Sequence, residues 1–503
     1  MRQAHAVADV RSAEHALMAT VPDGALMRRA AAGLAATCVR LLGRVYGSRV
    51  LVLSGTGDNG GDALYAGARL ASRGARVTAV QVGSHVHAGG AGALAEAGGR
   101  LVAASDRTVP SAIADADLII DGILGIGGRG GLREPAATLA DRTRRASADG
   151  AIVVATDLPS GVDADTGAVA GAAIAADVTV TFGTVKPGLL IDPGASYAGT
   201  VELVDIGLGP HLRAAPAAIA LQSADVGAML PQPGAESNKY RRGVLGVLAG
   251  SEKYTGAAVL SVGGAIRAGA GMVRLASARH AVEVVRQHWP EAVLTVVDSG
   301  DPAAAVDSAG RVQAWAAGPG LGTGDEARAL IGAVLATSLP VLVDADGLTV
   351  LAAHKDLLTR PAGAETLITP HAGELARLLN ANPDDIEAHR VDYVRRAAAE
   401  LGVTVLLKGS TTVVASPKDE PVLVNATGTP WLATAGSGDV LSGLAGALLA
   451  QGVRPARSAA AAAAFLHGLA GRLAARDAPI GAADIITALP EAIRLVSAAA
   501  TAA

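Results

Sequence analysis

The stretch GTGDNGGDAL, residues 55–64, follows the β-branched run RVLVLS of residues 49–54. Gly55, Gly57 and Gly60 have the G-x-G-x-x-G spacing of the turn that joins a strand to a helix in dinucleotide-binding folds. Glycines there let the backbone approach a phosphate, and the free N–H groups of the helix N-terminus attract its charge. The stretch therefore predicts an α/β fold that binds a ligand at a helix start.

Two features of this stretch leave its function open. The dinucleotide fingerprint also requires an acid at the end of the second strand, and the run RVTAVQV of residues 76–82 is followed by none. Asp58 and Asp62 place two carboxyl groups in the loop itself, which is unusual next to a phosphate. A tight strand-to-helix turn with solvated acids is the alternative, and the loop alone does not exclude it.

Length and composition restrict the class of protein. A chain of 503 residues is longer than the chains that typically fold around a single hydrophobic core, so two or three domains are expected. Half of the residues are hydrophobic and 17% are charged, which is typical of a globular chain. The net charge of −4 comes without a basic run, which argues against a nucleic-acid partner.

Cysteine usage and the N-terminal sequence predict a cytoplasmic protein. Cys38 is the only cysteine, so an internal disulfide is impossible and a reducing compartment fits best. The first residues, MRQAHAVADVRSAEHAL, contain acids and lack the apolar core of a signal peptide. Residues 77–95 and 421–438 are uncharged over nearly a membrane span. Their many small and polar residues favour strands and loops, so no membrane partner is expected.

Short β-branched runs alternate with Ala-rich stretches, which is the pattern of stacked βα units with a parallel sheet. The strands predicted in the first half are 49–54, 76–82, 117–121, 151–156, 177–182 and 200–205. Those predicted in the second half are 244–249, 341–344, 366–369 and 403–407, with long helices near 440–451, 457–474 and 483–497. Four prolines and a lack of periodicity mark residues 210–237 as the linker.

Polar residues follow three further strands of the first half, in the runs IIDGILGIGGRGGLREP, VVATDLPSGVDADTG and TFGTVKPG. These runs contribute Asp121, Asp157 with Ser160, and Lys186. A single Asp at such a position is more often a cap or turn residue, and Lys186 alone would fit a surface cation or a salt-bridge partner. Because ligands collect at the carboxyl ends of parallel strands, the group as a whole predicts a polar pocket.

Together these stretches resemble the NAD(P)H-hydrate epimerases over about residues 10–210. The resemblance implies a Rossmann-like αβα sandwich that epimerises carbon 6 of hydrated NADH or NADPH (NADHX or NADPHX). It implies substrate binding by Asp58, Asn59, Gly60, Gly61, Asp62, Gly125, Ile126, Gly127, Gly128, Arg129, Gly130, Gly131 and Asp157. It also implies a potassium ion on Asn59, Asp121 and Ser160, whose oxygen atoms suit a hard cation. The family usually has Asn where this chain has Asp58, and an anion there would weaken a phosphate contact unless backbone N–H groups make it.

The chemistry of epimerisation suits these residues. Hydroxide must leave carbon 6, assisted by the lone pair of the ring nitrogen, and return on the other face of the ring. A carboxylic acid that protonates the departing oxygen would act as general acid. We predict Asp157 in this role, with Lys186 as electrostatic support.

A second glycine-rich loop, ATAGSGDVLSG at residues 433–443, leads into a predicted helix. The N–H groups of Gly436, Ser437 and Gly438 would form an anion hole, and Asp439 would accept a hydroxyl proton beside a transferring phosphoryl group. The chain has no G-x-x-x-x-G-K-[ST] motif, so it is not a P-loop enzyme. On this motif alone, an Asp helix cap after a flexible loop is an equal alternative.

Other runs of the second half accompany this loop: NKYRRGVLGVLAGSEKYTGAAVLSVGGAIRAGAGMV, AAGPGLGTGD, VLVDADGL, LITPHAGELARLL and VLLKGSTTVV. Over about residues 222–500 they resemble the ADP- or ATP-dependent NAD(P)H-hydrate dehydratases, a ribokinase-like branch. The resemblance implies nucleotide binding by Lys408, Gly409, Ser410, Thr411, Thr412 and Gly438. It implies that Ala258, Gly322, His371 and Asp439 face the hydrated nicotinamide. Asn238 stands where His is usual, and Ala435 where Gly is usual.

The sequence thus predicts two α/β domains of three αβα layers, an epimerase at 1–215 and an ADP-dependent dehydratase at 222–503. The first would interconvert the R and S hydrates with K⁺, and the second would dehydrate the S hydrate with Mg²⁺ and ADP or ATP. The resemblance also implies a homo-oligomer. An ordinary ribokinase-like kinase of a sugar or vitamin alcohol, and a non-enzymatic scaffold, are the alternatives.

Overall fold

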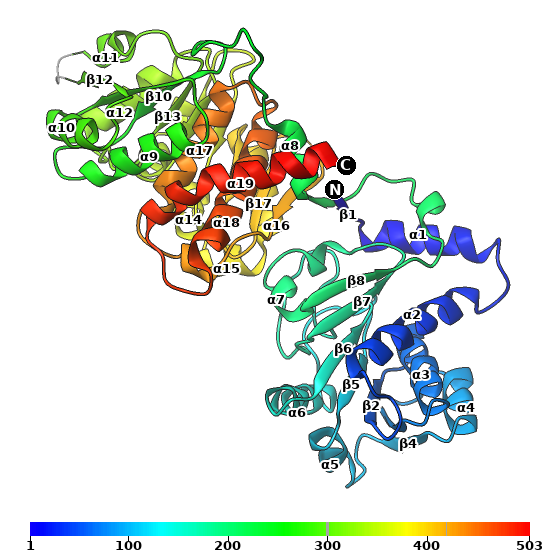
Figure 1. Ribbon diagram of the computed structural model, residues 1–503. Helices are drawn as coiled ribbons and strands as arrows, with labels where there is room; N and C mark the ends of the chain where they lie inside the picture. The colour runs from blue at the N-terminus through cyan, green and yellow to red at the C-terminus, as the bar shows by residue number, and fades with distance from the viewer. Residues whose placement is uncertain (298–300, 419, 503) are drawn as a thin grey trace. The chain divides into compact units, whose positions relative to one another are not determined.

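The computed structural model describes residues 1–297, 301–418 and 420–502 (Figure 1). The chain divides into two compact units, one of Gln3–Ala218 and one of Ile219–Ala503 together with Met1–Arg2. Each unit is built on a β-sheet with helices on both faces; the sheet is parallel in the first unit and mixed in the second. The α/β class predicted from the sequence is confirmed.

The first unit is built on a seven-stranded parallel sheet in the order β4-β3-β2-β5-β6-β7-β8. Its strands are β2 Arg49–Ser54, β3 Arg76–Gln81, β4 Arg100–Ala103, β5 Leu118–Gly122, β6 Ile152–Thr156, β7 Val178–Phe182 and β8 Thr200–Val204. The six strands predicted from the first half are all present. The prediction missed β4 because its run RLVA is short and largely exposed, so it carries no clear alternation.

Alternating side chains of the strands feed two cores, one on each face of this sheet. Val50 and Val52 pack with the helices α1 Val7–Met18, α2 Ala25–Leu42, α3 Asp58–Ala71 and α4 Ala88–Glu96. Leu51 and Leu53 pack on the other face with α5 Val109–Ala114 and α6 Ala136–Ala148. A short helix, α7 Gly194–Ala198, precedes the edge strand β8.

Strand β2 pairs with β3 on one side and with β5 on the other. The chain therefore winds outward in both directions from β2, and the loops after β2 and β5 diverge. Ligands of doubly wound sheets bind in the crevice at this point, outside the carboxyl ends of the strands. The fold places the glycine-rich segments at 55–59 and 122–131 on the two sides of that crevice.

Among the described residues, an eleven-stranded sheet in the order β1-β9-β18-β17-β16-β15-β14-β13-β10-β11-β12 forms the core of the second unit, and its strands β1 and β9 include residues on both sides of the division between the units. The strands are β1 Arg2–Ala4, β9 Ala218–Ala220, β10 Val244–Leu248, β11 Met272–Ser277, β12 Val293–Val296, β13 Ala314–Ala317, β14 Val341–Val343, β15 Thr366–Ile368, β16 Thr404–Leu407, β17 Thr412–Ala415 and β18 Val422–Asn425. The strands from β10 to β16 pair in parallel, and β17 runs antiparallel to both neighbours. Here too the order reverses at one point, between β10 and β13.

Helices cover both faces of this second sheet. They are α8 Ser223–Met229, α9 Thr255–Arg267, α10 Arg279–His288, α11 Pro302–Ser308, α12 Asp325–Leu335, α13 Asp346–Ala353, α14 Ala372–Leu379, α15 Pro383–Ala388, α16 Arg390–Leu401, α17 Ser437–Ala450, α18 Ala456–Ala475 and α19 Ala482–Ala502. The last three contain the long helices predicted from the sequence. Helix α17 is almost entirely buried, and it packs against α9 and α18.

The predicted linker, residues 210–237, is not irregular throughout. It contains β9 and α8, and a capping box between Gln222 and Asp225 starts the helix. The prolines at 216 and 231 lie just outside these two elements, where they interrupt neither a ladder nor a helix.

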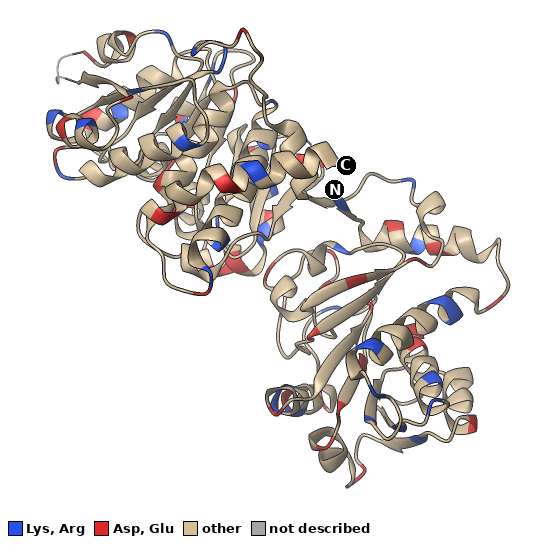
Figure 2. Cartoon of the chain, in the orientation of Figure 1, with Lys and Arg blue, Asp and Glu red and all other residues tan. Residues whose placement is uncertain are grey.

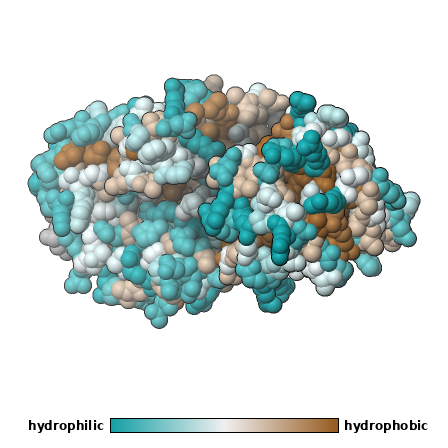
Figure 3. All heavy atoms as spheres, turned by 90° about the horizontal axis from the view of Figure 1, so that it is seen from below, coloured by the Kyte–Doolittle hydropathy of each residue, from teal (hydrophilic) through white to brown (hydrophobic). Residues whose placement is uncertain are grey.

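Helix α19 is long and apolar enough to cross a membrane by length and composition alone, a test that core helices also pass. Its Ile485, Ile486 and Leu489 are buried, and it packs on α8, α18 and α9. Basic and acidic residues are interspersed over the chain (Figure 2). The face seen in Figure 3 is mostly hydrophilic, with apolar residues gathered in a few patches.

Candidate functional site

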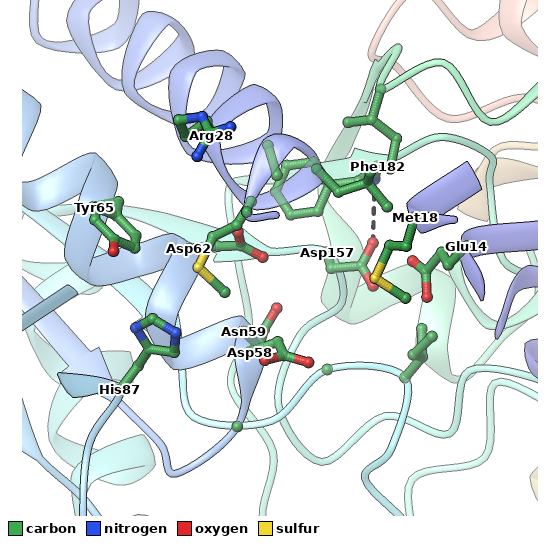
Figure 4. A pocket seen from close by; sticks show the side chains of 18 of the residues that line it. Glu14, Met18, Arg28, Asp58, Asn59, Asp62, Tyr65, His87, Asp157 and Phe182 are labelled. Carbon is green, nitrogen blue, oxygen red and sulfur yellow. Dashed lines mark hydrogen bonds between the residues drawn. The ribbon is translucent and has the colours of Figure 1, made fainter. Parts of the chain in front are cut away.

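A cavity of about 750 Å³ opens at the reversal point of the first sheet (Figure 4). The loops after β2 and β5, the end of β6 and the helices α1, α2 and α3 form its wall. The predicted residues that line it are Asp58, Asn59, Asp62, Gly125, Ile126, Gly127, Gly128 and Asp157. Gly60, Gly61, Arg129, Gly130 and Gly131 are not among the residues that line it.

Gly60 and Gly61 of α3, which do not line the cavity, have a packing role. A Cβ at Gly60 would lie 2.4 Å from the carbonyl oxygen of Gly55, and one at Gly61 would lie 2.9 Å from the His87 ring. Both positions exclude a larger residue, so the helix can start immediately after β2. Its first residue, Asp58, then lines the cavity.

Asp157 and Lys186 form a buried ion pair at this cavity. Nζ of Lys186 lies 2.5 Å from Oδ1 of Asp157, and it also donates to Thr181 Oγ1 and the carbonyl oxygen of Phe182, both at 3.1 Å. Oδ1 accepts further hydrogen bonds from the Thr181 hydroxyl and the Phe182 N–H, while the described residues show none to Oδ2. Lys186 is therefore a salt-bridge partner and not a surface cation, and it orients Asp157 toward the cavity.

The backbone of Asp157 is unusual. Its φ of 63° lies in the left-handed region, although the residue is not glycine. A non-glycine residue in that region costs free energy and persists only where the surroundings fix it. The hydrogen bonds to Oδ1 and the chain turn after β6 supply that constraint here.

Asp121, Ser160 and Asn59 meet behind the cavity around the backbone of Leu124. The Ser160 hydroxyl donates to Asp121 Oδ1 at 2.6 Å, and the Ser160 N–H donates to Oδ2 at 2.8 Å. The Ser160 hydroxyl also contacts the Leu124 carbonyl oxygen at 3.2 Å, and the Asn59 amide donates to the same oxygen at 3.0 Å. Burial raises the pKa of Asp121 to about 6, although the hydrogen bonds from Ser160 oppose the shift. The three predicted cation ligands are thus brought together.

Sequence reasoning missed the cavity residues that come from the N-terminal helices. Glu14 on α1 and Arg28 on α2 line the cavity and do not follow a strand; His87, in the segment between β3 and α4, lines it as well. Burial raises the pKa of Glu14, with further contributions from Asp157 and Asp58. No motif marked Glu14 and Arg28, because they reach the cavity only through the packing of α1 and α2.

In the second unit, Ala258 and Gly322 lie near the reversal point between β10 and β13. Ala258 is fully buried on α9, one turn from its start. Gly322 has a φ of 85°, and its N–H donates to Asp346 Oδ2 at 2.9 Å. A Cβ at Gly322 would meet nothing within 4 Å, so the space above this loop is open.

Lys408 directly follows β16 and lies beside two carboxyl groups, one from Asp344 after β14 and one from Glu374 in the first turn of α14. Its Nζ lies 2.8 Å from Asp344 Oδ1 and 3.6 Å from Glu374 Oε2. Asp344 Oδ2 accepts a hydrogen bond from the Ser442 hydroxyl at 2.5 Å. Burial alone lowers the pKa of Lys408, but Asp344 and Glu374 outweigh it and the net shift is upward. The lysine is therefore charged at neutral pH.

The second glycine loop meets this lysine. A Cβ added to Gly438 would lie 3.5 Å from Lys408 Nζ and 3.9 Å from Asp344 Oδ2. Helix α17 begins at Ser437, directly after Gly436 with its φ of 85°. The free N–H groups of this helix start and the Lys408 ammonium therefore face the same space, which suits an anion.

Asp439 lies in the first turn of α17 next to this space. Burial raises its pKa to about 7, and Asp344 adds to the shift while Lys408 opposes it. Among the described residues no hydrogen bond to the Asp439 carboxyl is found, so it does not cap its own helix. A carboxyl group with such a pKa is able both to take and to give a proton near neutral pH.

His371 has a structural role whatever else it does. It is the N-cap of α14, where Nδ1 accepts from the N–H groups of Gly373 and Glu374. The backbone N–H of His371 donates to Glu374 Oε2 at 2.8 Å, which completes a capping box. Its side chain is 57% exposed, so the ring faces solvent beside the site.

Lys408, Gly409, Ser410 and Thr411 form the turn between β16 and β17, and Thr412 is the first residue of β17. Arg390 lies under this turn with 1% exposure, and its guanidinium donates to the carbonyl oxygens of Leu407 and Lys408. A Cβ on Gly409 would collide with that guanidinium, at 2.3 Å. Sequence reasoning named neither Arg390 nor Asp344 as a site residue, although Asp344 is the last residue of the predicted strand 341–344.

Comparison with known proteins matches each of the two units to a family. A family model described as YjeF-related protein N-terminus matches residues 23–188, and one described as NAD(P)H-hydrate dehydratase matches residues 245–492. A bifunctional NAD(P)H-hydrate repair enzyme of Mycobacterium leprae is 49% identical over 503 residues, covering 99% of this chain and 98% of that protein. The chain belongs to the bifunctional NAD(P)H-hydrate repair enzymes.

More distant members agree with this membership. A bifunctional NAD(P)H-hydrate repair enzyme of Moorella thermoacetica is 35% identical and covers 90% of this chain and 88% of that protein. A solved ribokinase-like superfamily protein from Enterococcus faecalis is 24% identical, with a TM-score of 0.50, over 55% of this chain and 96% of that one. It shows the ribokinase-like fold of the second unit. The predicted family, fold and enzyme class are confirmed.

Proposed function

We propose that the chain repairs hydrated nicotinamide cofactors at two separate active sites. The domain of residues 1–215 interconverts the R and S forms of NADHX and NADPHX, and the domain of residues 222–503 dehydrates the S form with ADP or ATP. One observation carries the proposal: each unit brings a carboxyl group and a buried or half-buried lysine together at the carboxyl ends of its strands. These pairs are Asp157 with Lys186 and Asp439 with Lys408.

In the epimerase site, the carboxyl group of Asp157 exchanges a proton with the oxygen on carbon 6. Lys186 holds Oδ1, so Oδ2 is the oxygen that remains for the substrate. The lone pair of the ring nitrogen expels the protonated hydroxyl as water and leaves a cationic ring. The rest of the nucleotide is held by those parts of the segments 58–62 and 125–131 that line the cavity, which are Asp58, Asn59 and Asp62 at the start of α3 and residues 125–128 after β5.

The donor set behind the cavity fits a potassium ion. Asp121 and Ser160 offer oxygen atoms beside the Leu124 carbonyl. Asn59, whose amide nitrogen donates to that carbonyl, would offer Oδ1, and the described residues give Asp121 no cationic partner. A bound potassium ion would neutralise this buried carboxylate. The three residues would then fix the loop after β5, which carries half of the cavity wall.

In the dehydratase site, Asp439 removes the proton of the carbon-6 hydroxyl of the S form. The hydroxyl oxygen then attacks the terminal phosphoryl group of the nucleotide, which rests on the helix start at Gly438 and on Lys408. The P–O bond to the remaining nucleotide breaks as the new one forms. Phosphate is a better leaving group than hydroxide, so the ring nitrogen expels it, and loss of the carbon-5 proton restores NAD(P)H.

Ala258, Gly322 and His371 surround the hydrated nicotinamide in this proposal, and residues 408–412 hold the nucleotide. Magnesium supplies charge neutralisation on the phosphoryl oxygens. The described residues contain no group of three His, Cys, Asp or Glu side chains placed for a metal. Magnesium often keeps water and phosphate ligands and takes only one or two carboxylates, which Asp344 and Glu374 beside Lys408 would provide.

The decisive experiment uses chemically prepared NADHX, a mixture of both epimers, with Mg²⁺, K⁺ and either ADP or ATP. Return of NADH absorbance is followed for the wild type, Asp439→Asn and Asp157→Asn. We expect the wild type to recover both epimers, Asp439→Asn to recover none, and Asp157→Asn to recover only the S share quickly. The nucleotide that acts faster is the co-substrate. A stable phosphorylated product without NADH would instead support a simple kinase.

Cytoplasmic localisation and a homo-oligomer stay predictions of the sequence. Size-exclusion chromatography with light scattering would give the mass of the assembly directly. A monomeric mass would contradict the second prediction.

A further inference from the structure

The epimerase cavity contains a second buried carboxyl group, that of Asp62. Unlike Asp157, it has no lysine partner among the described residues. Asp62 lines the same wall, with 9% of its surface exposed, and its Oδ1 has no hydrogen-bond partner within the described residues. An unpaired buried carboxyl group is costly unless something at the site uses it. In Figure 4 the carboxyl groups of Asp62 and Asp157 reach into one cavity from α3 and from the end of β6.

The two carboxyl groups differ in their neighbours. Asp157 is paired with the Lys186 ammonium and accepts two further hydrogen bonds on Oδ1. Asp62 has no such partner. Burial raises its pKa well above the usual range, and the charges of Asp157, Asp58 and Glu14 raise it further. Pairs of carboxyl groups with such divergent surroundings are typical of an acid and a base that work together.

Inversion at carbon 6 makes a geometric demand that one carboxyl group does not meet. The oxygen leaves one face of the ring and water adds to the other face. A carboxyl group fixed on one element reaches only the face that it borders, so the second face needs its own proton donor or acceptor.

We propose that Asp62 is a second catalytic residue of the epimerase, acting on the ring face opposite Asp157. The inference rests on the proposed epimerase function and deepens it. Asp62 gives its proton to the departing oxygen as the C6–O bond breaks and the nitrogen lone pair forms the N1=C6 bond. A solvent water then adds to carbon 6 from the other face, and the N1=C6 electrons return to nitrogen.

Asp157 accepts the proton that this water loses, so one water is released and one is consumed. The reverse reaction exchanges the two roles, because Asp157 is then the acid and Asp62 the base. A proton passes back between the carboxyl groups after each turnover. No oxidant or other reactant is required.

The test separates inversion from exchange of the hydroxyl. The full chain is incubated with one of the two separated NADHX epimers, K⁺ and ¹⁸O-water, without ADP or ATP. The two epimers are then separated by chromatography, and the ¹⁸O content of each is measured by mass spectrometry. Rates without enzyme are subtracted. We expect every inversion by the wild type to introduce one ¹⁸O atom.

In Asp62→Asn, inversion should fall roughly a hundredfold, the typical contribution of one general acid. The epimer whose hydroxyl faces Asp157 should still exchange its oxygen without inverting, because Asp157 remains on that face. Asp157→Asn should show the same behaviour with the other epimer. This mirrored pattern is a result that a merely structural role of Asp62 does not produce.

Two results overturn the inference. One is inversion by Asp62→Asn at the wild-type rate, and the other is an equal loss of exchange in both epimers. If the wild type itself does not interconvert the epimers, the proposed epimerase function fails, and the inference fails with it.

Asp149→Asn is the matched control, because Asp149 is exposed at the end of α6 and is not among the residues that line the cavity. Melting curves check that each variant folds. Asp62→Ala, between Gly61 and Ala63, gives the same test should the amide not fit.

Discussion

Lys186 Nζ and Asp157 Oδ1 lie 2.5 Å apart, and the two side chains are only 1% and 11% exposed. Lys186 is the one lysine of the first 238 residues. It arrives at the ion pair from the turn after β7, whereas Asp157 follows β6. The pair therefore ties two neighbouring strand ends together at the cavity.

Lys186→Met should destabilise the first unit and stop epimerisation. Removing one member of a buried pair leaves an unpaired charge, which typically costs about 3–5 kcal/mol. Hydrogen–deuterium exchange of peptides from β6 and β7 measures the loss, and NADHX epimer ratios measure the activity. The double variant Lys186→Met with Asp157→Asn should regain part of the stability but no activity. If the single variant is as stable as the wild type, the pair does not fix the cavity.

Gly438→Ala should weaken nucleotide binding without destabilising the fold. The added Cβ would lie 3.5 Å from Lys408 Nζ, which is an ordinary contact, but it would stand in the space proposed for the phosphoryl group. We expect the KM for ADP to rise about tenfold or more, which corresponds to roughly 1.4 kcal/mol.

Gly443→Ala, one and a half turns further along α17, is the contrasting variant. Its Cβ would lie 1.9 Å from the carbonyl oxygen of Ser261 in α9, so the two helices would have to separate. Overpacking of this kind costs about 1–3 kcal/mol. We expect Gly443→Ala to lower the melting temperature and Gly438→Ala to leave it unchanged. Equal melting temperatures of the two variants would contradict the distinction.

Asp121→Asn should abolish the response of the first unit to potassium. In the wild type, K⁺ should raise the melting temperature, because it binds the folded chain and not the unfolded one. The neutral amide loses the charge that attracts the cation. Differential scanning fluorimetry in KCl, with choline chloride at equal ionic strength as the control, gives the comparison. A shift that persists in Asp121→Asn would place the ion elsewhere.

The first sheet could largely be predicted from the sequence, because its buried parallel strands are short, continuous β-branched runs, whereas only β10, β14, β15 and β16 of the second sheet were predicted. The strand β2 is an example, since the four apolar residues from Val50 to Leu53 stand without interruption between Arg49 and Ser54. The strand β13, AWAA, was not predicted because its alanines favour a helix by propensity. Its place between β10 and β14 is fixed by tertiary packing, which no local pattern encodes.

The same distinction applies to the sites. Asp157, Lys408 and Asp439 could be predicted because strand ends and helix starts are visible in the sequence. Glu14 could not, since only the packing of α1 beside the sheet brings it to the cavity. The role of Arg390 under the 408–409 turn was also hidden, because a buried arginine in a helix looks like any charged helical residue.

Dehydratase activity should fall as the pH is lowered through 7, because Asp439 must be ionised to take the hydroxyl proton. Burial and Asp344 raise its pKa to about 7 from an ordinary value of 3.8. Below that pH the ionised fraction, and with it kcat/KM, should drop about tenfold for each pH unit. A profile of kcat/KM for S-NADHX between pH 5.5 and 8.5, at saturating ADP and Mg²⁺, measures this. A flat profile through pH 6–7 would contradict the role of Asp439 as base.

The same shift makes a prediction about stability with the opposite sign. The folded chain binds the Asp439 proton more tightly than the unfolded chain, so this stabilisation is present at low pH and is lost as the pH rises from about 4 to about 7. Asp439→Asn cannot ionise, so it should be inactive yet more stable than the wild type at pH 8. Asp325→Asn, at the exposed start of α12, should change neither quantity. Denaturant titrations at pH 5 and pH 8 measure the free energy of unfolding of the wild type and the two variants. If the wild type is more stable than Asp439→Asn at pH 8, the folded site stabilises the carboxylate and the prediction is wrong.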